Sequence, residues 1–366
     1  MAGVYLHIPF CKSRCKYCDF FSTTQLEMRD KYVQALLREM HERTSYLGDE
    51  AVHTVYFGGG TPSQLTLEQL RTVLDALRAT FPIDDDAEIT LEANPGDLNP
   101  ETLVQLRALG FNRLSIGIQS LNDRLLTLIG RRHSAAQAIE VVHEARQAGF
   151  RNISVDFIYG LPGQTMQDWK DDVARVLSLS TEHLSAYCLS YEEGTPLTRM
   201  RDRKEVTETD EDTLNAMYDY LVETLEQNGL MRYEVSNFAL SGYESQHNSS
   251  YWNGTHYLGL GAGAHSFDGQ SRQWNKSDLP TYLSGKGYFE RELLSEEDRY
   301  NELVMLSLRT REGLDLEQVP DEYQKHVHKI AGSSVENGLL ARNGNRLVTT
   351  QKGIHILNRI IEDLMI

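Results

Sequence analysis

The 366-residue chain has few cysteines and no long apolar run. No stretch approaches the ~20 consecutive apolar residues that a membrane-spanning helix needs, so membrane association is expected to be peripheral at most. The first residues lead almost directly into an apolar strand pattern, Val4–Ile8, without the basic and apolar segments of a signal peptide. This start predicts a cytoplasmic protein. Internal repeats and low-complexity tracts are absent, and the composition is typical of a folded chain.

Basic residues are the minority, with 36 Lys and Arg against 53 Asp and Glu and a formal net charge of −17. A nucleic-acid-binding surface needs a basic patch that neutralises phosphates. Nucleic acid is therefore not an expected partner. The acidic excess predicts a well-solvated surface.

Three of the four cysteines, Cys11, Cys15 and Cys18, stand on one short segment. Three thiolates on a loop can each hold one iron of a [4Fe-4S] cluster, and the fourth iron then has no protein ligand. An open metal position is a place where a small molecule can bind and react. The spacing therefore predicts an iron–sulfur site that also binds a ligand.

Two alternatives remain open for these cysteines. Structural zinc usually has four protein ligands, and the chain has no second cysteine pair; His7 could be the fourth ligand, although it lies in an alternating apolar strand where a packed histidine is more common. Disulfides are less favoured, because three clustered cysteines leave an odd thiol and nothing marks the chain as exported. The lone Cys188 is interpreted as a small buried apolar residue.

From residue 4 to about 190, short apolar runs alternate with segments of helical period, which is typical of βα units around a parallel sheet. The predicted strands are Val4–Ile8, His53–Phe57, Glu88–Ala93, Arg113–Ile118, Asn152–Ile158 and His183–Leu189. The predicted helices between them are Asp30–Tyr46, Leu67–Thr80, Pro100–Leu109, Ala135–Ala148 and Thr165–Leu179. Several of these helices begin next to a Thr, Ser or Asn that can cap them.

Polar or glycine-rich clusters follow five of the predicted strands. They are the cysteine loop, Gly58-Gly59-Gly60-Thr61-Pro62, Glu92-Ala93-Asn94-Pro95, Gln119-Ser120 and Tyr159-Gly160-Leu161-Pro162. In α/β barrels the carboxyl ends of the strands form the rim that carries the active site. Turn chemistry alone also favours Gly, Pro and Asn at such places. The recurrence after five strands favours a functional rim.

After about residue 200 the pattern changes. A charged linker, Arg199–Thr209, precedes a helical segment, Asp210–Asn228, and a mixed region follows. The last part has the order helix, helix, strand, helix: Glu296–Thr310, Pro320–Asn337, Arg346–Thr349 and Gln351–Leu364. We therefore expect three parts, 1–200, 201–290 and 291–366, the last being a small winged-helix-like module.

Taken together, the cysteine segment and the rim motifs, with Ser115-Ile-Gly-Ile-Gln119-Ser120 and Asp156-Phe-Ile-Tyr-Gly-Leu-Pro162, resemble the radical S-adenosylmethionine (SAM) proteins related to oxygen-independent coproporphyrinogen III oxidase. The resemblance covers nearly the whole chain. It implies an α/β fold, a partial (β/α)6 TIM-like barrel of the radical SAM type with a mainly helical C-terminal domain. It also implies a [4Fe-4S] cluster whose open iron chelates the methionine moiety of SAM and, by electron transfer, yields a 5'-deoxyadenosyl radical.

The resemblance also assigns residues to the bound SAM. The cofactor-binding set that it implies is Tyr5, Tyr17, Gly59, Gly60, Thr61, Glu92, Gln119, Arg131 and Asp156. The glycine turn would contact the amino group, Glu92 the ammonium or a ribose hydroxyl, and Arg131 or its neighbour Arg132 the carboxylate. Without the resemblance, each of these residues could be an ordinary turn, cap or core residue.

Two departures and one motif indicate the heme chaperone branch of this family. The oxidases carry a further cysteine where this chain has Phe20, and they have a segment before the first strand that this chain lacks. The run His247-Asn248-Ser-Ser-Tyr251-Trp252 matches the motif of the chaperone branch. A histidine beside two aromatic residues offers an axial ligand and flat faces for a heme. The run could equally hold the C-terminal region onto the barrel.

The function implied is therefore heme trafficking by a protein that binds a [4Fe-4S] cluster, SAM and heme, and that delivers heme to acceptors such as respiratory enzymes. A homodimer is possible. The alternative is an oxidase that decarboxylates the propionates of coproporphyrinogen III.

Overall fold

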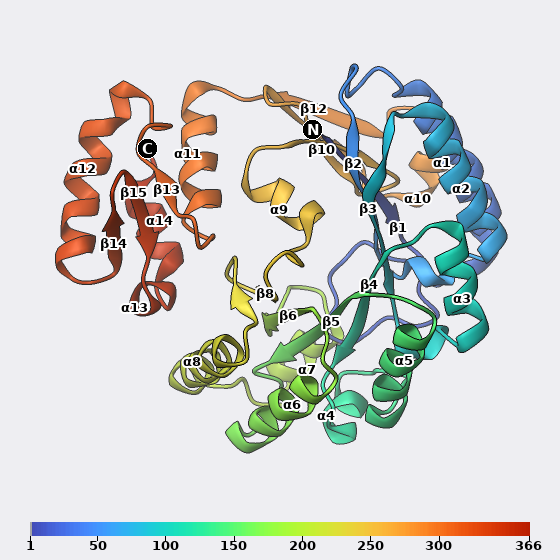
Figure 1. Cartoon of the computed structure of the whole chain (residues 1–366), viewed down its shortest axis with the longest axis horizontal. Helices are drawn as coiled ribbons and strands as arrows, with labels where there is room; N and C mark the ends of the chain where they lie inside the picture. The colour runs from blue at the N-terminus through green and yellow to red at the C-terminus, as the bar shows by residue number, and fades with distance from the viewer. Residues whose placement is uncertain (1) are drawn as a thin grey trace.

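The computed structural model describes residues 2–366 and contains a twelve-stranded mixed sheet, outer helices and a small C-terminal sheet (Figure 1). Strands β1 to β6 pair in chain order and all in parallel. The two edge strands of the large sheet, β12 and β7, do not pair with each other, so the barrel is open. The predicted partial (β/α)6 barrel is confirmed.

The six parallel strands are β1 (Ala2–Ile8), β2 (Val52–Gly59), β3 (Ile83–Ala93), β4 (Arg113–Gln119), β5 (Asn152–Tyr159) and β6 (His183–Cys188). The helices between them are α1 (Arg29–Glu42), α2 (Leu67–Thr80), α3 (Pro100–Leu109), α4 (Asp123–Leu128), α5 (Ala135–Gln147) and α6 (Met166–Ser178). Short 3-10 turns precede α1 and follow β2 and β3 (Leu26–Met28, Pro62–Gln64, Pro95–Asp97).

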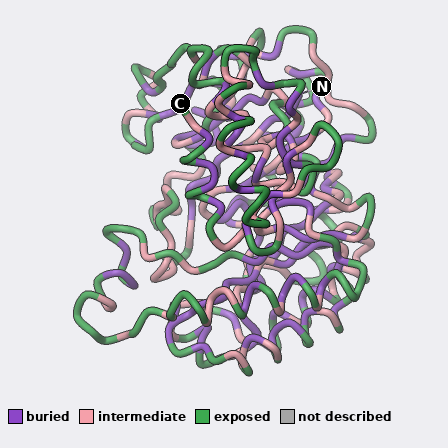
Figure 2. The backbone as a smooth tube through the Cα atoms, turned by 90° about the vertical axis from the view of Figure 1, so that its left-hand side faces the viewer, coloured by how far each residue is buried: buried purple, intermediate pink, exposed green. Residues whose placement is uncertain are grey.

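The cap residues explain where the outer helices begin. Thr66, Ser134 and Thr165 each accept a hydrogen bond from the backbone of the third helical residue, whose side chain bonds back to the cap. Such capping boxes satisfy two backbone donors that the helix itself cannot use. The strands between these helices are mainly buried, as Figure 2 shows for the interior of the molecule. The helix caps and the buried apolar runs together therefore account for where the parallel strands and the helices between them lie in the chain.

Six further strands were not foreseen from the sequence. They are β7 (Met231–Arg232), β8 (Asn237–Ala239), β9 (His256–Leu260), β10 (His265–Phe267), β11 (Ser271–Asn275) and β12 (Phe289–Leu293). Strand β9 adds to the sheet beside β1 in parallel, β10 to β12 continue it in antiparallel order, and β8 pairs with β6. These strands are two to five residues long, too short for a clear alternating pattern.

Helices also occupy the region that follows the barrel. They are α7 (Pro196–Asp202), α8 (Glu211–Gln227), α9 (Gln246–Trp252) and α10 (Leu279–Ser284). Helix α7 takes up the start of the predicted linker Arg199–Thr209, so that prediction was wrong for its first residues. Thr195 caps this helix and Pro196 stands at its first position, two start signals that the linker interpretation overlooked.

The C-terminal part has its own apolar core, separate from that of the barrel. Its elements are α11 (Glu296–Ser307), β13 (Leu314–Asp315), α12 (Asp321–Glu336), β14 (Leu340–Asn343), β15 (Arg346–Thr349), α13 (Gln351–Ile354) and α14 (Leu357–Leu364). The predicted helix Gln351–Leu364 is in fact two helices, and strands β13 and β14 were missed. Among residues 2–366, no helix combines the length and apolar character needed to cross a bilayer.

A buried carboxylate joins the added strands to the barrel. Glu39 of α1, only 2% exposed, accepts hydrogen bonds from the Tyr282 hydroxyl (2.6 Å), the Asn275 amide (2.7 Å) and the Gly261 backbone (2.8 Å). The Arg43 guanidinium lies 3.5 Å from the same carboxylate. Because the acceptors of Glu39 face donors from three different segments, this one side chain holds α1 against the loop after β9, β11 and α10.

We expect Glu39→Ala to lower the free energy of unfolding by about 3 kcal/mol or more, because it leaves buried donors and the Arg43 cation without their partner. Urea denaturation followed by circular dichroism measures the loss. The control is Glu68→Ala on α2, an exposed glutamate whose loss should change stability by less than about 0.5 kcal/mol. Equal stabilities of the two variants would contradict the role given to Glu39.

Candidate functional site

The cysteine loop follows β1 and is held in place by backbone contacts on both sides. Cys11 donates its backbone N–H to the Thr23 carbonyl (2.9 Å), and Lys16 donates to the carbonyl of Ile129 (3.0 Å). The His7 ring contacts the Phe21 carbonyl through Nε2 (2.9 Å), and burial lowers its pKa to about 4. His7 is therefore a packed residue that fixes the far end of the loop, as its place in the strand predicted.

All three thiols line one cavity of about 400 Å³. Burial raises the pKa of Cys11 and, to about 11, the pKa of Cys18, so without metal these two thiols are protonated at neutral pH. Iron must then displace these protons when it binds. No three His, Cys, Asp or Glu side chains in residues 2–366 gather around a single point suited to one metal ion. A cubane does not need such a point, because each thiolate binds a different iron.

The predicted cofactor residues meet at this same cavity, with one exception. Besides the cysteines, its walls include Tyr17, Gly59, Gly60, Thr61, Glu92, Gln119, Arg131 and Asp156. Tyr5 instead lies inside the barrel, where its ring stacks with those of Tyr56 and His247. Side chains separated by more than a hundred residues thus share one space, as expected for the carboxyl-end rim of a parallel sheet.

Arg131 links the cysteine loop to two strand ends. Its guanidinium donates to the Cys15 sulfur (3.4 Å), to the side chain of Asn94 and to the carbonyl of Gly117. Its Nε atom is buried and has no hydrogen-bond partner in the described structure. An orphaned guanidinium donor beside the cysteines fits an anionic ligand such as a carboxylate. The adjacent Arg132 instead pairs with Asp97 (3.1 Å), so of the two arginines it is Arg131 that lines the cysteine cavity.

The glycine turn allows the second loop to approach the first closely. Gly59 has φ of 108°, and a Cβ there would lie 2.7 Å from the His7 ring. A Cβ at Gly60 would lie 2.8 Å from the carbonyl carbon of Pro9 and 3.1 Å from the Cys11 sulfur. The Thr61 hydroxyl contacts the same sulfur at 3.4 Å. Bare backbone is therefore required here by packing, whether or not a ligand is also bound.

Two partly buried carboxyls, Glu92 and Asp156, lie at the inner wall of the cavity. Glu92 accepts hydrogen bonds from the Tyr56 hydroxyl (2.8 Å) and the Gly59 N–H (3.2 Å), and burial raises its pKa to about 7. Asp156 accepts from the Ser115 hydroxyl (3.1 Å), and burial raises its pKa too. Carboxyls that are costly to ionise in a cavity are suited to bind a cation.

Gln119 occupies the cavity from a distorted strand end. Its φ is 71°, one of three positive values among non-glycine residues in the described chain, and the pairing of β4 with β5 shifts register between Gly117 and Gln119. A left-handed conformation in a glutamine costs free energy and often marks a functional position. Because this residue belongs to the predicted contact set, the distortion supports its placement.

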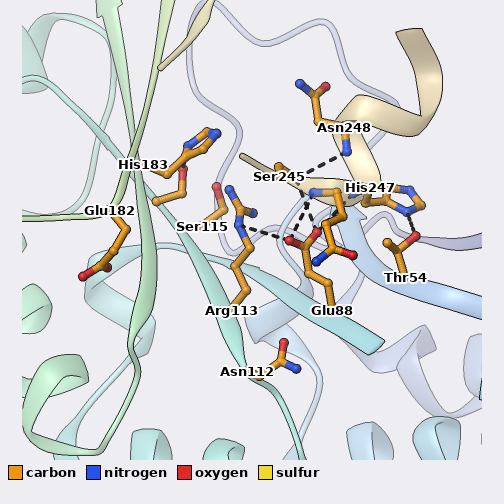
Figure 3. Close-up of polar contacts among 12 residues, drawn as sticks. Thr54, Glu88, Asn112, Arg113, Ser115, Glu182, His183, Ser245, His247 and Asn248 are labelled. Carbon is orange, nitrogen blue, oxygen red and sulfur yellow. Dashed lines mark hydrogen bonds and ion pairs between the residues drawn. The ribbon is translucent and has the colours of Figure 1, made fainter. Parts of the chain in front are cut away.

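A second cavity, of about 270 Å³, lies in the barrel interior next to the first and shares Glu92, Ser115, Asp156 and Tyr187 with it. Figure 3 shows polar side chains that converge near this space. Glu88 lies 4.0 Å from the Arg113 guanidinium and accepts the backbone N–H groups of Gln246 (3.2 Å) and His247 (3.1 Å). This carboxylate therefore holds the first turn of α9 in the barrel.

His247 is enclosed within the barrel, with 1% of its surface exposed. Its Nδ1 lies 2.8 Å from the Thr54 hydroxyl and its Nε2 lies 2.9 Å from the Tyr251 hydroxyl. Burial lowers the pKa of the ring to about 3, so it is neutral. Both nitrogens are engaged, and in this arrangement neither is free to bind a heme iron.

Tyr251 and Trp252, at the end of the same helix, line a third and different cavity. That cavity, of about 650 Å³, lies between the barrel and α11, and it shares no lining residue with the cysteine cavity. Figure 1 shows α9 between the barrel and the C-terminal part. The histidine of the motif therefore packs inward, Trp252 lines the cavity beside α11, and Tyr251 lines both that cavity and the one inside the barrel.

Several residues of the site were not singled out from the sequence. Asn94 bonds to both Arg131 and Thr61, although its motif had been noted. Tyr187 and Cys188 line the cysteine cavity, and Cys188 is exposed, so its interpretation as a buried apolar residue was wrong. It stands at the last position of β6, the same rim at which the other strands end. That position was the signal that could have identified it.

Comparison with known proteins identifies the family. Residues 5–176 match the Radical SAM superfamily, and residues 294–356 match the HemN C-terminal domain. The heme chaperone HemW of Lactococcus lactis is 35% identical over 100% of this chain and 97% of its own length. The chain belongs to the HemW family. HemW of Mycobacterium tuberculosis is 37% identical over 99% of this chain and 94% of its own length.

A solved structure supports the fold of the family. Coproporphyrinogen III oxidase (HemN) from Escherichia coli, described as a radical SAM enzyme, superimposes with a TM-score of 0.86 at 25% identity. The match covers 100% of this chain and 90% of that chain. The α/β fold of this chain is therefore that of the radical SAM proteins, and the helical C-terminal part is included in the match.

We expect Arg131→Ala to lower the free energy of unfolding by about 2–4 kcal/mol, since it removes a buried donor from Asn94 and the Gly117 carbonyl. Arg132→Ala, which breaks only a partly exposed pair with Asp97, should cost less than about 1 kcal/mol. Thermal and urea unfolding of the two variants, side by side, measure the difference. An Arg131 variant as stable as the Arg132 variant would be inconsistent with the buried bridge.

Proposed function

We propose that this protein is a heme chaperone that binds a [4Fe-4S] cluster and S-adenosylmethionine at the cysteine cavity and carries heme to acceptor proteins. Membership in the HemW family and the convergence of three thiols with the predicted cofactor residues support this proposal. We further propose that acceptors include respiratory enzymes, that the protein works in the cytoplasm, and that its three parts are 1–200, 201–290 and 291–366.

The residues present fit both absent groups. Cys11, Cys15 and Cys18 would hold three irons of the cluster, and the fourth iron would be open to the methionine moiety. The unpartnered Nε of Arg131 fits the carboxylate, and Glu92 fits the ammonium. When bound, the cluster and cofactor would supply one-electron chemistry at the sulfonium. The surrounding residues would orient the cofactor and exclude water.

We also propose that Tyr251 and Trp252 contact the heme, whereas His247 acts by positioning Tyr251. The hydrogen bond between the Tyr251 hydroxyl and the His247 ring and the burial of that ring support this division. The hypothesis of His247 as the axial ligand would require the ring to break its bonds to Thr54 and Tyr251.

Anaerobic heme transfer is the central test. The reconstituted protein, loaded with heme, should convert an apo-acceptor such as a heme-free respiratory enzyme to its active form. It should not convert coproporphyrinogen III to protoporphyrinogen IX under the same reducing conditions. Porphyrinogen conversion without transfer would instead establish the oxidase alternative, for which the similarity to HemN is the favouring observation.

Cluster loading has its own test. Cys15→Ser should reduce the iron and acid-labile sulfide content after anaerobic reconstitution to near background, because one of three ligands is lost. Cys188→Ser is the matched control, since this thiol is free, lines the same cavity and should leave both contents unchanged. Iron retained in the Cys15 variant, or lost in the Cys188 variant, would contradict the ligand set.

Binding of SAM should tighten as the pH rises through about 7. Burial raises the pKa of the Glu92 carboxyl to about 7, with Asp156 raising it further and Arg113 lowering it. The carboxyl is neutral below this pH and anionic above it, and only the anion attracts a cationic ligand. Equilibrium binding of SAM between pH 6 and 8 should show this rise in the native protein. The Glu92→Gln variant should bind SAM weakly, and its affinity should not rise with pH over this range.

A further inference from the structure

The cavity between the barrel and the C-terminal part has a composition that neither the cluster nor the cofactor explains. Its barrel side carries Tyr251 and Trp252 at the end of α9, Tyr257 of β9 and Phe267 of β10. Its other side carries Leu303 and Leu306 of α11. We name this space of about 650 Å³ the interdomain cleft. It lies within the roughly 300–1,000 Å³ that small-ligand sites occupy.

The aromatic side chains of the barrel side are packed against their neighbours. Tyr251 meets Tyr257 edge to face, with ring centroids 4.8 Å apart, and the Arg272 guanidinium covers the Phe267 ring at 4.1 Å. The indole Nε1 of Trp252 is buried and has no hydrogen-bond partner in the described structure. An aromatic surface beside an unused polar donor is suited to an aromatic ligand that also carries acceptors.

Arginines border this aromatic surface in a chain of net charge −17. Arg272, Arg299, Arg311 and Arg346 line the cleft, together with Glu244, Glu302, Glu312 and Asp315. Arg272 is paired with Glu302 (2.8 Å) and Arg346 with Asp315 (3.3 Å).

The other two arginines, Arg299 and Arg311, form weaker contacts within the protein. Arg311 lies 3.9 Å from Glu312, at the limit of an ion pair, and Arg299 donates to the Leu294 carbonyl (3.2 Å). Arg299 is exposed, and 49% of the Arg311 side chain is exposed. Guanidinium groups with this freedom can form two-pronged bonds to carboxylates.

We propose that the interdomain cleft is the heme site, with the macrocycle against the aromatic side chains of the barrel side and the two propionates held by Arg299 and Arg311. This inference rests on the proposed chaperone function and adds the place in the fold where heme binds. A heme in this cleft would be separate from the cysteine cavity, with which it shares no lining residue. Tyr251, which also lines the cavity in the barrel interior, would be in contact with both the heme and that cavity.

The residues that line the interdomain cleft also limit which protein atoms can coordinate the heme iron. The lining residues of the cleft comprise three tyrosines, Tyr233, Tyr251 and Tyr257, but no His, Cys or Met. The iron of a heme bound there therefore takes a phenol oxygen or water. The ferric protein should show a high-spin absorption spectrum that His247→Gln leaves high-spin. A low-spin spectrum that disappears in this variant would overturn the assignment.

The propionate clamp is tested with two probes, hemin and hemin dimethyl ester, in which both carboxylates are blocked. The native protein should bind hemin at least ten-fold more tightly than the ester. The double variant Arg299→Ala/Arg311→Ala should lose most of this preference, and Arg299→Lys/Arg311→Lys should keep part of it through the remaining charges.

The matched control is Arg71→Ala/Arg359→Ala, which removes two exposed arginines outside the cleft. It should bind both probes within two-fold of the native protein. A native-like hemin preference in the Arg299/Arg311 double alanine variant would overturn the proposed site while leaving heme binding itself intact. Failure of the native protein to bind hemin at all would instead refute the chaperone function and the site with it.

Discussion

Parallel pairing of β1 to β6 is the constraint on which the candidate site depends. Because these strands run in one direction, the loops after them meet at one rim, and the cysteine loop, the glycine turn and the ends of β3 to β6 share a cavity. Arg131 then ties the cysteine loop to the ends of β3 and β4 through Cys15, Asn94 and Gly117. The order and direction of the strands therefore bring these side chains into one cavity.

The barrel interior is polar. Burying polar groups costs free energy, and hydrogen bonds from α9 offset part of that cost. Arg113 and Glu88 are both buried, and the backbone N–H groups at the start of α9 complete the hydrogen bonds of the Glu88 carboxylate. Once α9 is held there, its far end reaches the interdomain cleft. One seven-residue helix thus connects the space beside the cysteine cavity to the surface that faces α11.

Much of the fold could be predicted from the sequence because its signals are local. The alternation of apolar runs with capped amphipathic segments identified β1 to β6 and five of the helices between them, but it missed the six-residue helix α4. Helices α2 and α3 have the predicted bounds. Strands β7 to β12 could not be predicted in this way, since each is at most five residues long and forms only by pairing with a sheet that already exists. Their pairing partners are distant in the chain.

The sequence by itself determined the cysteine spacing, the order of rim motifs and the family, because these are properties of residue type and position along the chain. Only the tertiary structure decided that Arg131 rather than Arg132 enters the cavity, that Tyr5 and His247 stack inside the barrel, and that Trp252 faces a separate cleft. A side chain's direction depends on packing between segments that are far apart in the chain, and no local pattern records it.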